Sequence, residues 1–256
     1  MNDRILTLRC HSGISGDMLL AGLAFFALSE AELAPGSHAA DAWLGERCGE
    51  ILPELGPALT LAPHAVNGIQ GWQARVDLPV SHEHRHLADI VAIISNSGMR
   101  EAAKSAAAKC FELMADCEAR AHGIAAQDVH FHEVGALDSI LDICLSCELF
   151  QRLGAPELIA SPLPVADGEI ACRHGLLPAP APAVMQLLQG VPVRPFAGDA
   201  QAGELITPTG IALLRCLGAT FGPWPSFRLA SSCLVYGTRE FAGAANGLIC
   251  GLGEPL

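Results

Sequence analysis

The chain contains 256 residues, 51% of them apolar, which is enough to bury a sizeable core in one large domain or two small ones. A mean hydropathy of +0.36 and only 16% charged residues argue against intrinsic disorder. The formal net charge of −12 argues against nucleic acid or an anionic membrane as a partner, because both bind basic surfaces. The longest apolar run, residues 18–28, is too short to cross a bilayer, and no cationic stretch precedes a long apolar segment, so we expect a cytoplasmic protein.

Apolar periodicity and turn residues predict the elements in chain order. We expect a strand over 5–10, helices over 18–28 and 42–52, strands over 59–66 and 72–80, helices over 87–95, 100–121 and 138–153, a strand over 168–172, a helix over 183–188, a helix that begins at Pro208, and strands over 227–236 and 247–252. Asn67-Gly68 predicts a hairpin between the second and third strands. Hairpin-like strands mixed with helices, without a strict βαβ rhythm, predict an α+β fold: a mixed or antiparallel sheet with several packed helices.

The segment HFHEVGALDSILDI (130–143) concentrates metal-ligating side chains. His130 and His132 share one face of an extended chain, and Glu133 adds an oxygen donor before the turn. Asp138 and Asp142, four residues apart, share one face of the helix that follows. Such a nitrogen and oxygen donor set suits Ni, Mn, Fe or Zn better than Cu(I). The alternative interpretation is a polar helix start whose first carboxylate stabilises the helix dipole.

A second histidine-rich segment, SHEHRH (81–86), precedes the helix expected over 87–95. His82, His84 and His86 alternate, so an extended chain places all three on one side. A flexible loop of this kind binds metal weakly and exchanges it, which suits delivery. It could equally be an exposed polar loop before a helix.

The turn SGISGD (12–17) joins the first strand to the first helix. Its Gly and Ser residues can leave backbone N–H groups free to hold an anion such as phosphate, although the sequence is not a Walker A motif. The alternative is a tight turn with a capped helix. Cys172, His174, Thr207 and Thr209 lie in two further loops, where phosphate or metal contact and plain loop architecture are equally compatible with the sequence.

Six collinear motifs extend over nearly the whole chain. They are SGISGDM (12–18), the His-rich stretch before HLADI, VHFHEVGALDSILDI (129–143), SPLPVADG (161–168), HGLLPAPAPA (174–183) and GELITPTGIALL (203–214). In this order and at similar spacings they resemble the LarC family of nickel insertion proteins. The resemblance implies insertion of Ni(II) into a pyridinium bisthiocarboxylate mononucleotide pincer cofactor by a lyase-type chelatase, which uses CTP with a divalent ion such as Mn(II) or Mg(II).

The spacing and the resemblance together assign roles to residues. We expect a central metal site of His130, His132, Glu133, Asp138 and Asp142, in which the three carboxylates are also the catalytic residues. His82, His84 and His86 are expected to form a capture loop. The residues expected to contact the cofactor are Ser12, Gly13, Ser15, Gly16, Asp17, His174, Thr207 and Thr209. Because ligation requires neutral imidazole, we expect metal capture to fail below about pH 6.

The resemblance also sets expectations about domains and partners. Residues 1–256 resemble the N-terminal module of the family, with a subdivision expected near 80–86 into a small α/β part (1–80) and a helical, site-bearing part (87–256). The usual C-terminal nucleotide-binding domain is absent, so a separate nucleotide-binding subunit is an expected partner, beside the cofactor precursor and further copies of the chain in a homo-oligomer.

Two departures from the family pattern stand out. The family usually has Asp before the first-strand cysteine, where this chain has Arg9 before Cys10, and its glycine-rich segment corresponds here to LVYGTRE (234–240). Two other functions use the same residues: a metal-dependent hydrolase or phosphotransferase with water in an open coordination position, and a non-catalytic subunit that binds a nucleotide-like cofactor. Turnover with the cofactor precursor, Ni(II) and nucleotide separates the three.

Overall fold

A seven-stranded mixed sheet forms the centre of the computed structural model, which describes residues 3–53, 58–77, 85–131, 136–172, 174–198, 203–241 and 246–256. Its strand order is β11 (Thr220–Phe221), β6 (Glu157–Ala160), β1 (Ile5–Arg9), β13 (Leu248–Pro255), β12 (Phe227–Tyr236), β3 (Ile69–Val76) and β2 (Leu59–Val66). β1 pairs parallel with β6 and antiparallel with β13, so the sheet is mixed, as the sequence predicts.

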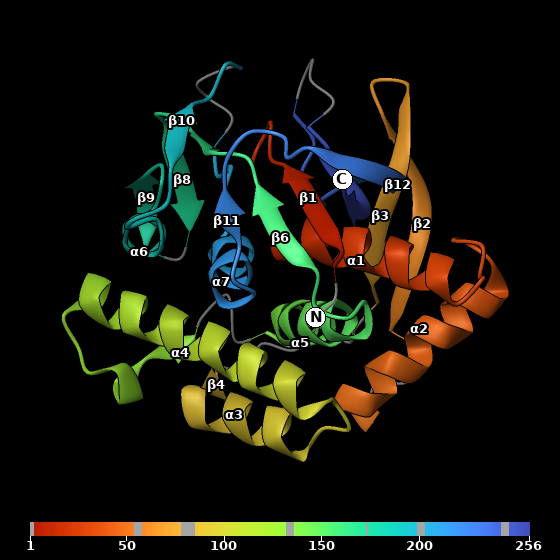
Figure 1. Cartoon of the computed structure of the whole chain (residues 1–256). Helices are drawn as coiled ribbons and strands as arrows, with labels where there is room; N and C mark the ends of the chain where they lie inside the picture. The colour runs from red at the N-terminus through yellow and green to blue at the C-terminus, as the bar shows by residue number, and fades with distance from the viewer. Residues whose placement is uncertain are drawn as a thin grey trace.

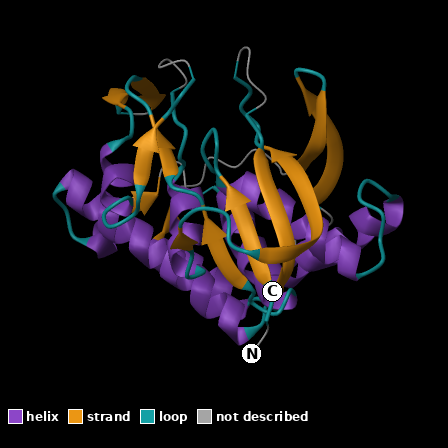
Figure 2. Ribbon diagram, turned by 45° about the horizontal axis from the view of Figure 1, so that its top comes forward, coloured by secondary structure: helices purple, strands orange, loops and turns teal. Residues whose placement is uncertain are grey.

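Helices collect on one side of this sheet (Figures 1 and 2). They are α1 (Gly16–Glu30), α2 (His38–Ile51), α3 (Leu87–Asn96), α4 (Glu101–His122), α5 (Leu137–Arg152), α6 (Pro182–Leu187) and α7 (Pro208–Cys216), with a 3-10 turn over Ala126–Asp128. α1 packs between the sheet and α5, and α4 packs against α5, α6 and α7. The α+β prediction is confirmed, and every predicted helix and strand is present within a few residues of its expected bounds.

Local sequence explains the best-predicted elements. Asn67 and Gly68 both adopt positive φ, 50° and 77°, which is the two-residue turn that joins β2 to β3. Gly123 ends α4 in the left-handed conformation. Ser37 and Thr207 cap α2 and α7 by accepting hydrogen bonds from Ala40 N and Gly210 N.

Apart from β8 (Glu169–Cys172), which the sequence predicts as a strand over 168–172, the short strands were not predicted. Three two-stranded sheets lie beside the main one: β7 (Leu163–Val165) with β10 (Val193–Pro195), β4 (Arg85–His86) with β5 (His130–Phe131), and β8 (Glu169–Cys172) with β9 (Gly175–Pro178). Strands of two to four residues have no apolar period of their own, so their pairing depends on neighbours far away in the chain.

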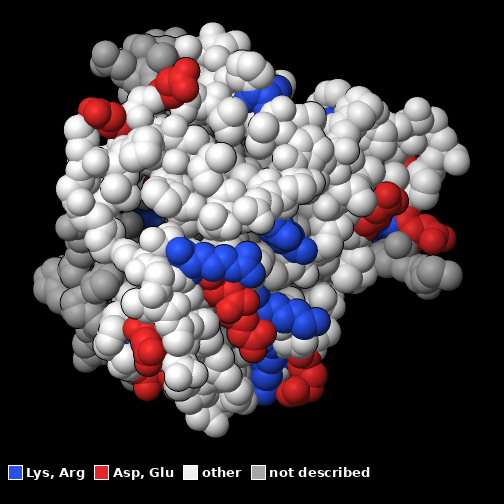
Figure 3. Space-filling model, turned by 90° about the vertical axis from the view of Figure 1, so that its left-hand side faces the viewer, with Lys and Arg blue, Asp and Glu red and all other residues white. Residues whose placement is uncertain are grey.

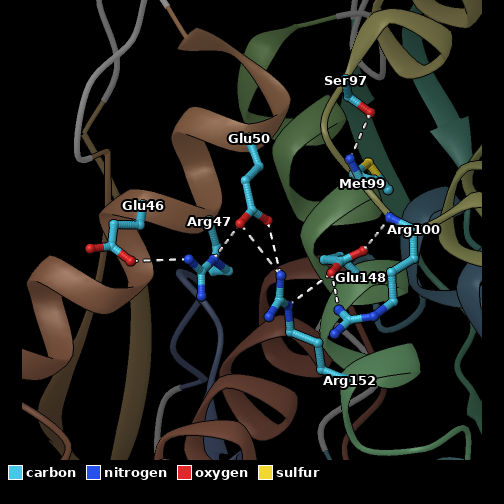
Figure 4. A network of polar contacts seen from close by, with 8 residues as sticks. All are labelled: Glu46, Arg47, Glu50, Ser97, Met99, Arg100, Glu148 and Arg152. Atoms are coloured by element: carbon cyan, nitrogen blue, oxygen red, sulfur yellow. Dashed lines mark hydrogen bonds and ion pairs between the residues drawn. The ribbon is translucent and has the colours of Figure 1, made fainter.

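An ion network centred on the buried Glu148 joins three helices (Figure 4). Glu148 on α5 is 1% exposed; it accepts from Arg100 N at 2.9 Å, pairs with the Arg100 guanidinium, and lies 2.8 Å from Arg152 Nε. Arg152 Nη2 also lies 3.1 Å from Glu50 on α2. The network fixes α2, α5 and the start of α4 relative to one another.

Strands from both sides of residues 80–86 belong to the same sheet, since β1, β2 and β3 pair with β6, β12 and β13 directly or through one another. The division at that point therefore stays a prediction. In the described part of the chain, no helix combines the length and the apolar character needed to cross a bilayer. The face that carries α4 and α6 is mostly uncharged, with basic and acidic side chains interspersed (Figure 3).

Candidate functional site: a carboxylate cavity beside a histidine cavity

The N-termini of α1, α5 and α7 converge on a cavity of about 600 Å³, which the ends of β3 and β12 complete from the sheet side. We call it the carboxylate cavity, because Asp17, Asp138 and Asp142 all line it. Ser12, Ser15, Gly16, Thr207 and Thr209, predicted from the sequence to contact the cofactor, line it too. The motif 203–214 and the turn 12–17 are therefore brought together in space although nearly 200 residues separate them in sequence.

Glycine permits this close convergence. Gly13 has φ +115°, and a side chain there would overlap the Leu205 carbonyl. A Cβ on Gly16 would lie 2.9 Å from Thr209 Oγ1 and 3.3 Å from Asp142 Oδ2, and one on Gly210 would lie 2.8 Å from the Ile14 carbonyl oxygen. The glycines of two motifs thus let the helix starts pack against one another.

The turn at 12–17 already uses several of its backbone N–H groups. Ile14 N donates to Leu205 O at 2.9 Å, Gly16 N to Thr209 Oγ1 at 3.3 Å, and Met18 N to Asp17 Oδ1 at 2.8 Å. These contacts anchor the start of α1 to the neighbouring loop, although the N-cap residue Ser15 makes no side-chain capping hydrogen bond. A role for this turn in anion binding stays a prediction.

Asp17 ties the first helix to the segment that follows β12. Ser15 Oγ donates to its Oδ1, and Thr238 N donates to its Oδ2 at 2.9 Å. Gly237 leaves room for this contact, because a Cβ there would lie 3.3 Å from Asp17 Oδ2. The segment 234–240, singled out in the sequence as poor in glycine, therefore forms a wall of the cavity.

Asp138 and Asp142 lie one turn apart on α5 and both line the carboxylate cavity, as their spacing predicts. Asp138 is exposed, and its Oδ1 accepts from Ser139 N at 2.7 Å. Asp142 is half-buried. Burial raises its pKa well above 3.8, and the nearby charges of Asp17 and Asp138 raise it further. Among the described residues no cationic side chain pairs with it.

The histidines do not line the carboxylate cavity but lie in an adjoining one. His130, His122 and His174 line a second cavity of about 330 Å³, which we call the histidine cavity; Glu204 and Pro208 line both cavities. The His122 and His174 rings are 4.8 Å apart between centroids, and His122 Nε2 lies 3.4 Å from Glu118 Oε2. Cys172 lines the same cavity.

Strand pairing places His130 apart from the aspartates. It lies opposite His86 in the β4–β5 ladder, with the ring centroids 4.0 Å apart. The structure therefore brings Asp138 and Asp142 together with Asp17, and His130 together with His86 and His174, in two adjoining groups. His82, His84, His132 and Glu133 lie outside the described residues. Within the described ranges, no three His, Cys, Asp or Glu side chains are already arranged around one metal position.

Several polar residues of the carboxylate cavity were not among the predicted site residues. They include Gln73 and Arg75 on β3, and Arg239 and Asn246 near β12 and β13. Arg239 lies within the segment 234–240, which the family resemblance had already singled out, so the sequence could have indicated this residue. Gln73 and Arg75 lie on a strand with no local motif, so only the fold places them at the cavity.

Arg9, the departure from the family pattern, has a structural role. It is 2% exposed, donates to Leu8 O and Gly222 O, and stacks 5.0 Å from the centroid of the Trp224 ring. Burial raises the pKa of the neighbouring Cys10 thiol to about 12, so this cysteine stays protonated at neutral pH. Neither side chain lines the carboxylate cavity.

Carboxylates converging in a cavity next to clustered imidazoles are typical of proteins that handle divalent metal ions. Comparison with known proteins narrows this class. Residues 6–254 match the family model described as nickel insertion protein, and the chain belongs to that family.

Curated relatives include a "pyridinium-3,5-bisthiocarboxylic acid mononucleotide nickel insertion protein" of Staphylococcus epidermidis, 37% identical over 93% of this chain and 56% of its own length. The protein of the same name from Desulfitobacterium hafniense is 40% identical over 87% of this chain and 52% of its own length. A "putative nickel insertion protein" of Geotalea daltonii is 37% identical over 98% of this chain and 61% of its own length. The chain thus spans a little over half the length of these relatives. No solved structure matches it.

Proposed function

We propose that the chain binds Ni(II) and the mononucleotide precursor of the nickel-pincer cofactor, and holds both for nickel insertion. Membership of the nickel insertion family supports this, as do the names of the relatives, which specify a pyridinium bisthiocarboxylic acid mononucleotide. A cavity of about 600 Å³ is within the range that accommodates a mononucleotide-sized ligand.

The observation that most strongly supports this proposal is the environment of the Asp142 carboxyl group. Asp142 is half-buried, lies near two further carboxylates, and has no cationic partner among the described residues. A partly desolvated carboxylate without a counter-charge is unfavourable when ionised, and a divalent ion supplies that counter-charge. Nickel is the substrate at this position: oxygen donors hold it less firmly than the softer sulfur donors of a thiocarboxylate, so transfer to the cofactor is favourable. Asp138, Asp142 and Glu133 keep the catalytic assignment made from the sequence.

The histidine cavity is assigned to nickel acquisition. His130 and His174 line it, His86 stacks on His130, and its wall is shared with the carboxylate cavity through Glu204 and Pro208. His82, His84 and His132 are assigned to the same step from their spacing in the sequence. Imidazole exchanges metal readily enough for an ion to pass from this cavity to the neighbouring carboxylates.

The finer activity is a lyase-type nickel chelatase that works in the cytoplasm. Because the relatives are nearly twice as long as the matched region, the use of CTP with Mn(II) or Mg(II) is assigned to a nucleotide-binding part outside these residues. That part acts as a partner of this chain, and the chain associates with further copies of itself.

Isothermal titration with Ni(II) tests the proposal on the wild-type chain, on Asp142→Asn, and on Asp116→Asn as a matched control on the exposed face of α4. We expect Asp142→Asn to weaken nickel binding by about 100-fold, the loss of one charged ligand, while Asp116→Asn leaves it unchanged. In a second step the nickel-loaded chain is mixed with the cofactor precursor, and the cofactor absorbance is followed. Equal nickel affinity in wild type and Asp142→Asn would overturn the proposal.

A further inference from the structure

Two arginines line the sheet side of the carboxylate cavity. Arg75 extends from β3, and Arg239 follows β12, whereas the three aspartates come from the helix starts. Within the described ranges neither Arg75 nor Arg239 forms an ion pair, although Asp17, Asp138 and Asp142 line the same cavity.

Each guanidinium is held in place by neutral neighbours. Gln73, 9% exposed, donates to Gly237 O at 2.9 Å and accepts from Arg75 Nε at 3.3 Å. This contact uses one of the five N–H donors of Arg75 and leaves four for a ligand. Arg239 lies 5.9 Å from the centroid of the Phe241 ring and packs against Gly203, where any Cβ would overlap the guanidinium.

Asn246 provides a second, independent sign of a ligand at this wall. Its side chain is 94% buried, and Nδ2 donates to the Arg239 carbonyl at 2.7 Å. Its Oδ1 is buried and accepts no hydrogen bond in the described structure, while the residue lines the cavity. An unsatisfied buried amide oxygen destabilises the protein, and a hydroxyl donor on a ligand would satisfy it.

We propose that Arg75 and Arg239 bind the phosphate of the mononucleotide and that Asn246 accepts from one of its sugar hydroxyls, so that the ring bearing the metal-accepting atoms extends toward Asp142. This inference rests on the proposed function and adds the orientation of the substrate. Two guanidinium groups suit a phosphate monoester, whose oxygens accept paired N–H donors. The separation of cations on the sheet side from carboxylates on the helix side keeps the phosphate from competing for the nickel ion.

The test measures binding of nicotinic acid mononucleotide and of nicotinic acid riboside, which lacks the phosphate, by titration calorimetry. The proteins are wild type, Arg75→Gln, Arg239→Gln and the matched control Arg228→Gln, an exposed arginine of β12 outside both cavities. We expect wild type and Arg228→Gln to bind the mononucleotide at least about tenfold more tightly than the riboside. In Arg75→Gln and Arg239→Gln we expect that preference to fall to about twofold.

The same samples separate this inference from the proposed function. Ni(II) affinity should be equal in all four proteins, and thermal melting should show that all four are folded. A phosphate preference that persists in both cavity variants, or no binding of the mononucleotide to wild type, would overturn the assignment. Competition by CTP or inorganic phosphate as strong as that of the mononucleotide would equally overturn it. In contrast, equal nickel affinity in wild type and in the separately measured Asp142→Asn would count against the proposed function alone.

Discussion

Helix α5 carries two carboxylates, six residues apart, that have opposite electrostatic surroundings: Glu148 is buried and Asp142 is half-buried. Glu148 is surrounded by Arg100 and Arg152, and its charge is fully paired. Asp142 faces Asp17 and Asp138 instead, and both neighbours raise its pKa. The fold therefore provides cationic partners for Glu148, whereas no cationic side chain among the described residues pairs with Asp142. We infer that Glu148 stabilises the packing of the helices and that Asp142 binds a metal cation.

The largest expected effect comes from the paired carboxylate. Glu148→Ala leaves Arg100 without a counter-ion and Arg152 paired only with Glu50, and because both arginines are partly exposed we expect the free energy of unfolding to fall by about 3 kcal/mol, the lower end of the range for a buried pair. Urea denaturation measures this change. Nickel affinity should stay at the wild-type value, and a loss of stability below about 0.5 kcal/mol would show that the network does not hold the helices together.

Gly16→Ala tests how closely the helix starts must pack around Asp142. The new Cβ would lie 2.9 Å from Thr209 Oγ1 and 3.3 Å from Asp142 Oδ2, so we expect a loss of about 2 kcal/mol in stability from overpacking, together with weaker nickel binding. Gly49→Ala is the control, because a Cβ there meets nothing within 4 Å. If Gly16→Ala is destabilised but binds nickel with unchanged affinity, close packing at this position is not required for nickel binding.

The unpaired carboxylate predicts a particular pH dependence of the metal-free chain. Because the folded pKa of Asp142 lies above its unfolded value of 3.8, the folded state binds this proton more tightly. The resulting stabilisation is complete below pH 3.8 and is lost as the pH rises through the folded pKa. Asp142→Asn lacks this loss, so its stability relative to wild type should increase toward neutral pH. Parallel unfolding curves for the two proteins at pH 4 and pH 8 would contradict the raised pKa.

The smallest effect is expected in the histidine cavity. His174→Ala removes an imidazole that lines this cavity and not the carboxylate cavity, so nickel affinity at Asp142 should change by about twofold at most. Rapid-mixing measurements should instead show slower loading with nickel. A loss of affinity as large as that of Asp142→Asn would mean that the two cavities act as one site.

Local pattern accounts for much of the fold. The hairpin at Asn67-Gly68, the glycine end of α4 and the proline starts of α6 and α7 are each set by residues a few positions apart, and all are present. The i,i+4 spacing of Asp138 and Asp142 likewise predicts their common cavity. The predicted convergence of His130 with these aspartates needed a long-range contact, and the pairing of His130 with His86 placed it elsewhere.

By itself the sequence determined which side chains are candidate metal ligands, the helix starts that carry the aspartates, and the family. These features depend on short spacings and on motif order, which can be recognised from local sequence patterns and from similarity to a family. Only the tertiary structure decided that Asp17 joins Asp142, that the histidines occupy a neighbouring cavity, and that Arg75 and Asn246 reach the same space as the carboxylates. The physical reason is that sheet order, and not sequence distance, fixes which strand ends meet the helix N-termini.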